Sequence, residues 1–126
     1  MRLTESEWLI MNALWRGHPA TAREIEERLR GDVRWAYTTL KTLLSRLAGK
    51  SVVGERKHGN TSVYTPLVSR GQARRAALST LLDQAFDGEV APLLRFVVHD
   101  RKLSDHQRRE LIRLLQRGDR GRGRAS

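Results

Sequence analysis

Hydrophobic residues recur at helical spacing through the N-terminal half of the chain. The i, i+3, i+4, i+7 repeat predicts helices over residues 5–16, 22–30 and 36–49, each with one stripe turned toward a core. Gly49 stands where the C′ residue of the third helix is expected, because glycine adopts the left-handed conformation without strain. The apolar positions are Trp8, Ile10, Met11, Leu14 and Trp15, then Ile25 and Leu29, then Leu40, Leu43, Leu44 and Leu47.

Four capping boxes mark expected helix starts along the chain. In each, a Ser or Thr is followed three residues later by Glu or Gln. The hydroxyl can then accept from the backbone N–H of the third residue, whose side chain accepts from the N–H of the cap. Each box precedes an apolar-periodic segment, which favours a helical frame. The boxes are Thr4 with Glu7, Thr21 with Glu24, Ser69 with Gln72, and Ser104 with Gln107.

An alternating pattern follows the third predicted helix. Residues 51–56 and 62–67 are typical of two short strands, joined by a turn over residues 57–61. Gly59 and Asn60 suit that turn because both tolerate positive φ angles. Three helices followed by a hairpin is the order of a winged helix-turn-helix, a fold that places one helix in the DNA major groove.

The C-terminal part predicts three more helices, over residues 70–86, 90–98 and 105–117. These helices are apolar around much of their circumference, and a small winged domain cannot bury all of their apolar faces. We therefore expect a mostly α protein with a small β wing, with a DNA-binding domain over residues 1–68 and a helical dimerisation module over residues 69–117. An intramolecular bundle that closes on the first domain is the alternative. The residues expected in the dimer contact are Leu78, Leu81, Leu82, Phe86, Leu93, Leu94, Phe96, Val97, Leu111, Leu114 and Leu115.

The net charge of +10 is unevenly distributed. Acidic and basic residues balance over residues 1–31, whereas residues 32–70 carry seven basic and two acidic residues, with no acid between Val33 and Gly54. Clustered positive charge favours a nucleic-acid partner, although arginine richness that reflects genome composition is an alternative. Residues 118–126 are rich in Gly and Arg and are expected to form a disordered basic tail.

The polar face of the third predicted helix is the candidate reading surface. Threonine methyl groups suit thymine methyl groups, and hydroxyls suit base edges or phosphates. Lys41 and Arg46 suit contacts to phosphates, and such contacts position a protein on DNA without specifying sequence. An ordinary solvated helix face, and an ordinary surface turn for the wing, are the alternatives. The candidate DNA-binding residues are Tyr37, Thr38, Thr39, Lys41, Thr42, Ser45 and Arg46 on the helix, and Arg56, Lys57, His58 and Asn60 on the wing.

Catalytic and cofactor chemistry has little support in the sequence. There is no cysteine, so disulfides and thiolate metal sites are excluded. His99 and His106, with Asp100 and Asp105 nearby, could hold a metal ion but suit a polar loop better, so we expect no metal and no cofactor. No nucleophile–base pair or paired catalytic carboxylate is recognisable, so we do not expect an enzyme. Because no signal peptide or membrane-spanning run is evident, we expect a cytoplasmic protein.

Several segments together resemble the penicillinase repressor family, which includes BlaI, MecI and the copper-responsive CopY branch. They are LTESEWLIMNALW, TAREIEERL, WAYTTLKTLLSRLAGKSVV and the wing end VYTPLVS, and the resemblance extends over residues 3–117. It implies a homodimeric transcriptional repressor on a palindromic operator, connected with antibiotic resistance. It also implies that a membrane-bound sensor metalloprotease, triggered by β-lactam, cuts the repressor within its dimerisation module.

The chain departs from the family pattern at three places. The best-known members have asparagine before the phenylalanine of the cleaved segment, whereas this chain has Arg95 before Phe96, the candidate cleavage position. Many members begin the reading helix with Ser-Pro, and here Ala36 and Tyr37 stand there. The cysteine cluster of the copper branch is missing, which excludes thiolate copper sensing. A ligand-responsive winged-helix regulator and a winged-helix protein-interaction scaffold are the alternative functions.

Overall fold

The computed structural model describes residues 1–100 and 102–125. The chain divides into two compact units, Met1–Thr80 and Leu81–Ser126. The boundary between these units falls inside a helix, and the functional division after residue 68 that composition predicts stays a prediction. The segment after the wing is tied to the first unit, because the Trp15 indole donates to the Val68 carbonyl at 3.0 Å and Ala73 is only 1% exposed.

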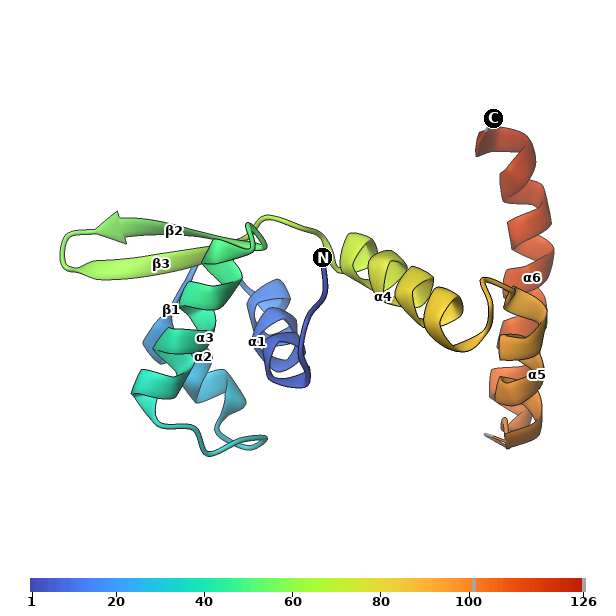
Figure 1. The fold of residues 1–126 in the computed structure, drawn as a ribbon, viewed down its shortest axis with the longest axis horizontal. Helices are drawn as coiled ribbons and strands as arrows, with labels where there is room; N and C mark the ends of the chain where they lie inside the picture. The colour runs from blue at the N-terminus through green and yellow to red at the C-terminus, as the bar shows by residue number, and fades with distance from the viewer. Residues whose placement is uncertain (101, 126) are drawn as a thin grey trace. The chain divides into compact units, whose positions relative to one another are not determined.

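Three helices surround the core of the N-terminal unit: α1 (Glu5–Arg16), α2 (Ala22–Leu29) and α3 (Tyr37–Gly49) (Figure 1). They confirm the three predicted helices. Trp8 and Trp15, expected inside, are only partly buried. The core side chains are at most 4% exposed and are Ile10, Met11, Ala13, Leu14, Ala20, Ala22, Ile25, Leu29, Leu40, Leu44, Leu47, Val52, Val53 and Tyr64.

All four predicted capping boxes are present as reciprocal hydrogen bonds. In the first box, the backbone N–H of Glu7 donates to Thr4 Oγ1 at 3.2 Å, and the backbone N–H of Thr4 donates to Glu7 Oε1 at 2.8 Å. α3 begins differently, because its N-cap residue Ala36 makes no side-chain cap hydrogen bond. Hydrogen bonds between residues three positions apart therefore determine where α1 and α2 begin, but not where α3 begins.

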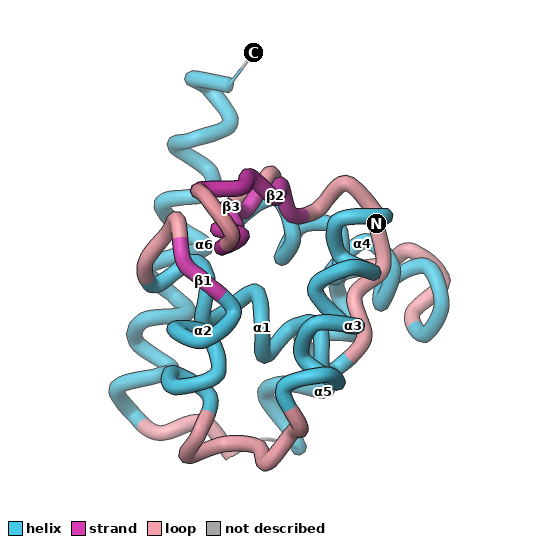
Figure 2. The backbone as a smooth tube through the Cα atoms, turned by 90° about the vertical axis from the view of Figure 1, so that its left-hand side faces the viewer, coloured by secondary structure: helices cyan, strands magenta, loops and turns pink. Residues whose placement is uncertain are grey.

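A small antiparallel sheet completes the unit, in the order β1–β3–β2. β1 (Ala20–Thr21), β2 (Val53–His58) and β3 (Thr61–Pro66) are its strands, and Figure 2 shows β3 between the other two. β1 was not predicted, because two residues carry no detectable alternation. It lies directly before α2, and its pairing of Ala20 with Tyr64 ties that helix to the wing.

The wing, formed by β2 and β3, has strands of the predicted length, but their positions are shifted along the chain and the turn between them is tighter than predicted. His58 pairs with Thr61, which leaves Gly59 and Asn60 as the turn. Gly59 has φ +64°, a conformation that costs glycine little. The predicted turn residues Lys57 and His58 therefore belong to β2, and strand geometry decides where their side chains point.

The end of α3 also differs from the prediction. Gly49 is the last helical residue, and Ser51 instead adopts the left-handed conformation, with φ 61°. The N–H of Val52 donates to the Leu47 carbonyl and the N–H of Ser51 to the Ala48 carbonyl, both at 3.0 Å. These two bonds form a Schellman motif, whose C′ position here holds serine where glycine is favoured.

Three further helices follow the wing, as predicted: α4 (Arg70–Ala85), α5 (Val90–Asp100) and α6 (Asp105–Ala125). α4 runs across the boundary between the units. α6 extends to Ala125 in the structure, and the disordered tail that the composition predicts from residue 118 stays a prediction. Ser126 lies outside the described residues. Within the described ranges, no helix combines the length and apolar character needed to cross a bilayer.

Candidate nucleic-acid interface

The outer face of α3 is polar, exposed and free of acidic side chains. The opposite face is fixed inward, because Leu40, Leu44 and Leu47 are at most 2% exposed. Thr42 Oγ1 donates to the Thr38 carbonyl at 3.0 Å, which leaves its methyl group and oxygen lone pairs available. Five of the predicted residues are brought together on this exposed face, namely Thr38, Thr39, Thr42, Ser45 and Arg46.

Lys41 does not belong to that exposed face. Its side chain is half-buried, and Nζ donates to the Tyr64 hydroxyl of β3 at 3.1 Å, with Nζ 5.6 Å from the centre of the ring. The hydrogen bond to Tyr64 raises the pKa of Lys41, so its ammonium group stays charged at neutral pH. Lys41 therefore connects α3 with the wing, a contact that the sequence did not predict, and the phosphate contact predicted for it stays a prediction.

Tyr37, the first residue of α3, is half-buried against the core. The guanidinium of Arg23, from the first turn of α2, lies 4.0 Å from the centre of its ring. The Arg23 side chain is 72% exposed and also lies 3.4 Å from Glu26 Oε1. Sequence reasoning missed Arg23, because it falls in a charge-balanced segment and only the fold brings it to the start of α3.

Strand alternation separates the basic residues of the wing. Glu55 pairs with Tyr64, whose hydroxyl reaches α3, and Lys57 lies two residues further along β2, so Lys57 occupies the sheet face that looks toward α3. Arg56 and His58 occupy the opposite face. The wing therefore adds one basic side chain on the α3 side, a distinction that the sequence pattern did not make. The predicted wing residues, all exposed, are Arg56, Lys57, His58 and Asn60.

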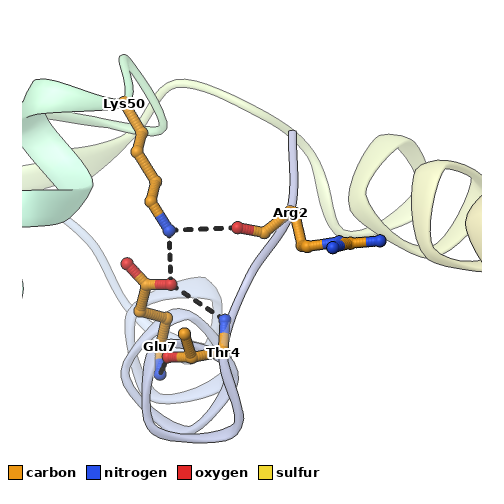
Figure 3. A network of polar contacts seen from close by, with 4 residues as sticks. All are labelled: Arg2, Thr4, Glu7 and Lys50. Atoms are coloured by element: carbon orange, nitrogen blue, oxygen red, sulfur yellow. Dashed lines mark hydrogen bonds and ion pairs between the residues drawn. The ribbon is translucent and has the colours of Figure 1, made fainter.

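A partly buried ion pair joins α1 to the end of α3 (Figure 3). Lys50, the C-cap of α3, donates from Nζ to Glu7 Oε1 at 2.7 Å and to the Arg2 carbonyl at 3.0 Å. The Glu7 side chain is 2% exposed and that of Lys50 is 39% exposed. Burial alone raises the pKa of Glu7, but the hydrogen bonds from Lys50 and Thr4 outweigh it, and the net pKa is lowered. Sequence analysis identified Glu7 only as a capping residue.

The apolar residues predicted for the dimer contact stay largely uncovered in the single chain. Phe96 is 60% exposed, Leu114 58% and Leu115 53%, and none of the α5 side chains is buried. Phe96 contacts Phe86 edge-on, with ring centres 6.1 Å apart. Of the other predicted residues, Leu78 and Leu81 are exposed, and the partly buried ones are Leu82, Phe86, Leu93, Leu94, Val97 and Leu111.

The histidines of the C-terminal unit do not form a recognisable metal site. His106 Nε2 lies 3.7 Å from Glu110 Oε2 within α6. In the part of the chain that the structure describes, no three His, Cys, Asp or Glu side chains gather closely enough to hold a metal ion.

Three helices, the third with an exposed polar face, and a β wing define a winged-helix DNA-binding domain, which further helices follow. A model of the penicillinase repressor family matches residues 3–117, and the chain belongs to that family. The protein is accordingly a DNA-binding transcriptional repressor, and its family is not one of enzymes.

Individual relatives agree with this assignment. The chain is 24% identical over 115 residues to the methicillin resistance regulatory protein MecI of Staphylococcus aureus (strain N315), covering 91% of this chain and 94% of MecI. It is 34% identical over 99 residues to the transcriptional regulator BlaI of Mycobacterium tuberculosis (strain ATCC 25618 / H37Rv), covering 76% and 72%. The solution structure of the DNA binding domain of the repressor BlaI superposes with a TM-score of 0.51 at 26% identity, over 55% of this chain and 84% of that one.

Proposed function

We propose that the protein is a homodimeric repressor that binds a palindromic operator and places one α3 in the major groove of each half-site. The exposed, acid-free face of α3 carries the proposal, because hydroxyls, methyl groups and a guanidinium match what DNA presents there. A two-fold protein matches a two-fold operator, with the half-sites separated by whole helical turns.

Each part of the interface has a separate role in this proposal. Thr38 and Thr42 contact base edges and thymine methyl groups, with Thr39 and Ser45 beside them. The longer Arg46 reaches a phosphate, which positions the helix without reading sequence. On the wing, the residues that contact the DNA backbone are Lys57 on the α3 side, Arg56 and His58 on the opposite face, and Asn60 at the turn.

The uncovered apolar residues of α4, α5 and α6 support the dimer. Side chains such as Phe96 and Leu114 are more than half exposed in the single chain, and pairing with a second copy would remove them from water. Dimerisation makes engagement of the second half-site effectively intramolecular. The pair can then bind far more tightly than one domain alone without any new DNA contact.

A salt series with duplex DNA tests the interface in the full chain. Arg46→Ala should weaken binding and lower the slope of log K against log salt by about one for each engaged half-site, because one phosphate contact is lost. Arg74→Ala removes another exposed arginine, from α4, and should leave the slope unchanged. Equal slopes for the two variants would contradict the assignment of Arg46 to a phosphate.

Sequence reading is tested separately from affinity. Thr38→Ala should change the preferred base at one position of a duplex enriched from a random pool, and leave affinity for random DNA nearly intact. An unchanged set of enriched sequences would remove Thr38 from the reading residues.

We also propose that operator release follows when the C-terminal helices are cut or loosened. The candidate bond is Arg95–Phe96, and the candidate protease is a membrane-bound sensor metalloprotease that responds to β-lactam. Both residues are exposed but lie inside α5, so the helix must open locally before a protease can bind it as an extended chain. Mass spectrometry of the repressor from induced cells should show a fragment that ends at Arg95, and derepression with an intact chain would refute this route.

A further inference from the structure

α3 is held by polar contacts near both of its ends, and lysine ammonium groups provide them. Lys41, in the second turn, donates to the Tyr64 hydroxyl of β3 at 3.1 Å. Lys50, at the C-cap, donates to Glu7 Oε1 of α1 at 2.7 Å (Figure 3). Among the described residues, these are the side-chain hydrogen bonds that connect α3 and its C-cap to α1 and to the wing.

The remaining support of α3 is apolar. Leu40, Leu44 and Leu47 are buried. Because hydrophobic burial is non-directional, it determines which face of α3 turns inward more firmly than it determines the tilt of the helix or its position along its own axis. Hydrogen bonds depend on distance and angle, so a bond near each end restricts both movements. Groups that read base edges must be held to about 0.5 Å, and such supporting contacts supply that precision.

The partners of both lysines are themselves fixed. Tyr64 is 2% exposed and pairs with β1 and β2 as part of the central strand β3. Glu7 is 1% exposed, and its Oε1 also accepts from the backbone N–H of Thr4 in the capping box of α1. Its Oε2 has no hydrogen-bond partner among the described residues, so the Lys50 ammonium is the charge that compensates this buried carboxylate.

We infer that the Lys41–Tyr64 and Lys50–Glu7 contacts set the orientation of α3 for base reading, so that these four are positioning residues and not DNA contacts. This inference rests on the proposed function of α3. It assigns two basic residues of the reading region to contacts within the protein, and predicts that they influence sequence preference while Arg46 influences general affinity for DNA.

The test compares two probes in the full chain. One is the duplex that the wild type enriches from a random pool, and the other is a random-sequence duplex of equal length. For Tyr64→Phe and Lys50→Met, preference for the enriched duplex should fall about tenfold, the size of one mismatched base pair. Affinity for the random duplex and its salt slope should stay at the wild-type values, because no phosphate contact is removed.

Two additional variants control for charge and for folding. Glu5→Gln removes an exposed carboxylate from the same turn of α1 and should change neither probe. The double variant Glu7→Gln/Lys50→Met leaves no unpaired buried charge and should show the same reduced preference for the enriched duplex. The single variant Lys50→Arg keeps the positive charge and should retain most of the wild-type preference. Circular dichroism confirms folding of each variant, and Tyr64→Phe, which loses a single hydroxyl, decides the matter if a Glu7 variant unfolds.

The outcomes separate the two proposals. Folded variants that keep the wild-type preference would overturn the positioning role. A lower salt slope in Lys50→Met with unchanged preference would also overturn it, because Lys50 would then contact a phosphate. A wild-type chain that enriches no sequence at all would instead overturn the proposed function.

Discussion

The guanidinium of Arg23 lies 4.0 Å from the centre of the Tyr37 ring, at the point where α2 approaches the start of α3. The stacking holds an otherwise flexible and exposed cation beside the first turn of α3. α3 lacks a side-chain cap at Ala36, so this end of the helix also presents backbone N–H groups. Arg23 is therefore placed to contact a phosphate that flanks the reading face.

Replacing Arg23 tests this placement. Arg23→Ala should lower affinity for both operator and random duplexes and reduce the salt slope by about one per half-site, because an electrostatic contact is lost without loss of base reading. Fluorescence anisotropy over a range of salt concentrations measures both quantities. Tyr37→Leu keeps the apolar packing but removes the stacking partner, and should reproduce part of the effect; full binding by both variants would exclude Arg23 from the interface.

The left-handed serine after α3 offers a prediction about stability. Ser51→Gly should raise the free energy of unfolding by roughly 0.5–1 kcal/mol, because relief of the strained φ exceeds the added chain entropy of glycine. Urea unfolding measures the change. The matched control is Ser79→Gly in the interior of α4, where the helical conformation gives glycine no advantage and roughly 0.5 kcal/mol should be lost. A loss at position 51 as well would show that Ser51 is not strained.

Acid should weaken the N-terminal unit through Glu7. The folded-state pKa of this carboxyl is lowered from its ordinary value of 4.5, so its stabilising contribution is complete above that value and is lost as pH falls through the folded pKa. The pKa of Glu24 is lowered too, by its hydrogen bonds with Thr21, and adds a similar dependence. Unfolding free energies between pH 7 and pH 2 should therefore decline below about pH 4.5.

Glu7→Gln should flatten part of this decline. It should also cost about 1.5–3 kcal/mol at neutral pH, the usual worth of a hydrogen bond to a charged group. The exposed Glu5→Gln variant should retain the wild-type pH dependence. A Glu7→Gln profile parallel to that of the wild type would show that the Lys50 pair contributes nothing to acid sensitivity.

Charge introduced into the apolar face of α6 should separate the proposed dimer. Leu114→Glu together with Leu115→Glu replaces two side chains that are more than half exposed in the single chain, so the monomer should fold while self-association fails. Sedimentation velocity should show a monomer. A binding titration should show that this monomer has a lower affinity for operator DNA than the wild type. A control pair at Arg108 and Arg109, each changed to Gln, should stay dimeric; a stable dimer of the leucine variant would move the contact away from α6.

The sequence was sufficient for features encoded within a few residues of each other. The capping boxes and the leucine stripe of α3 each depend on spacings of three or four positions, and both are confirmed. The pairing of Ala20 with Tyr64 and of Lys50 with Glu7 joins residues 43 or more positions apart, where no periodic pattern connects them. The contact of Lys41 with Tyr64 was not predicted for the same reason, since the 23 positions between the two residues are bridged only by folding.

The capping boxes have a consequence for how this protein can vary between relatives. Because each boxed helix start is specified within four residues, a loop ahead of it can lengthen or shorten without shifting the helix that follows. The lengths of these loops can therefore vary between relatives, whereas a change at Glu7 or Lys50 alters how the end of α3 is positioned against α1. Co-variation of those two positions, and not identity along the loops, would be the signature of a preserved reading geometry.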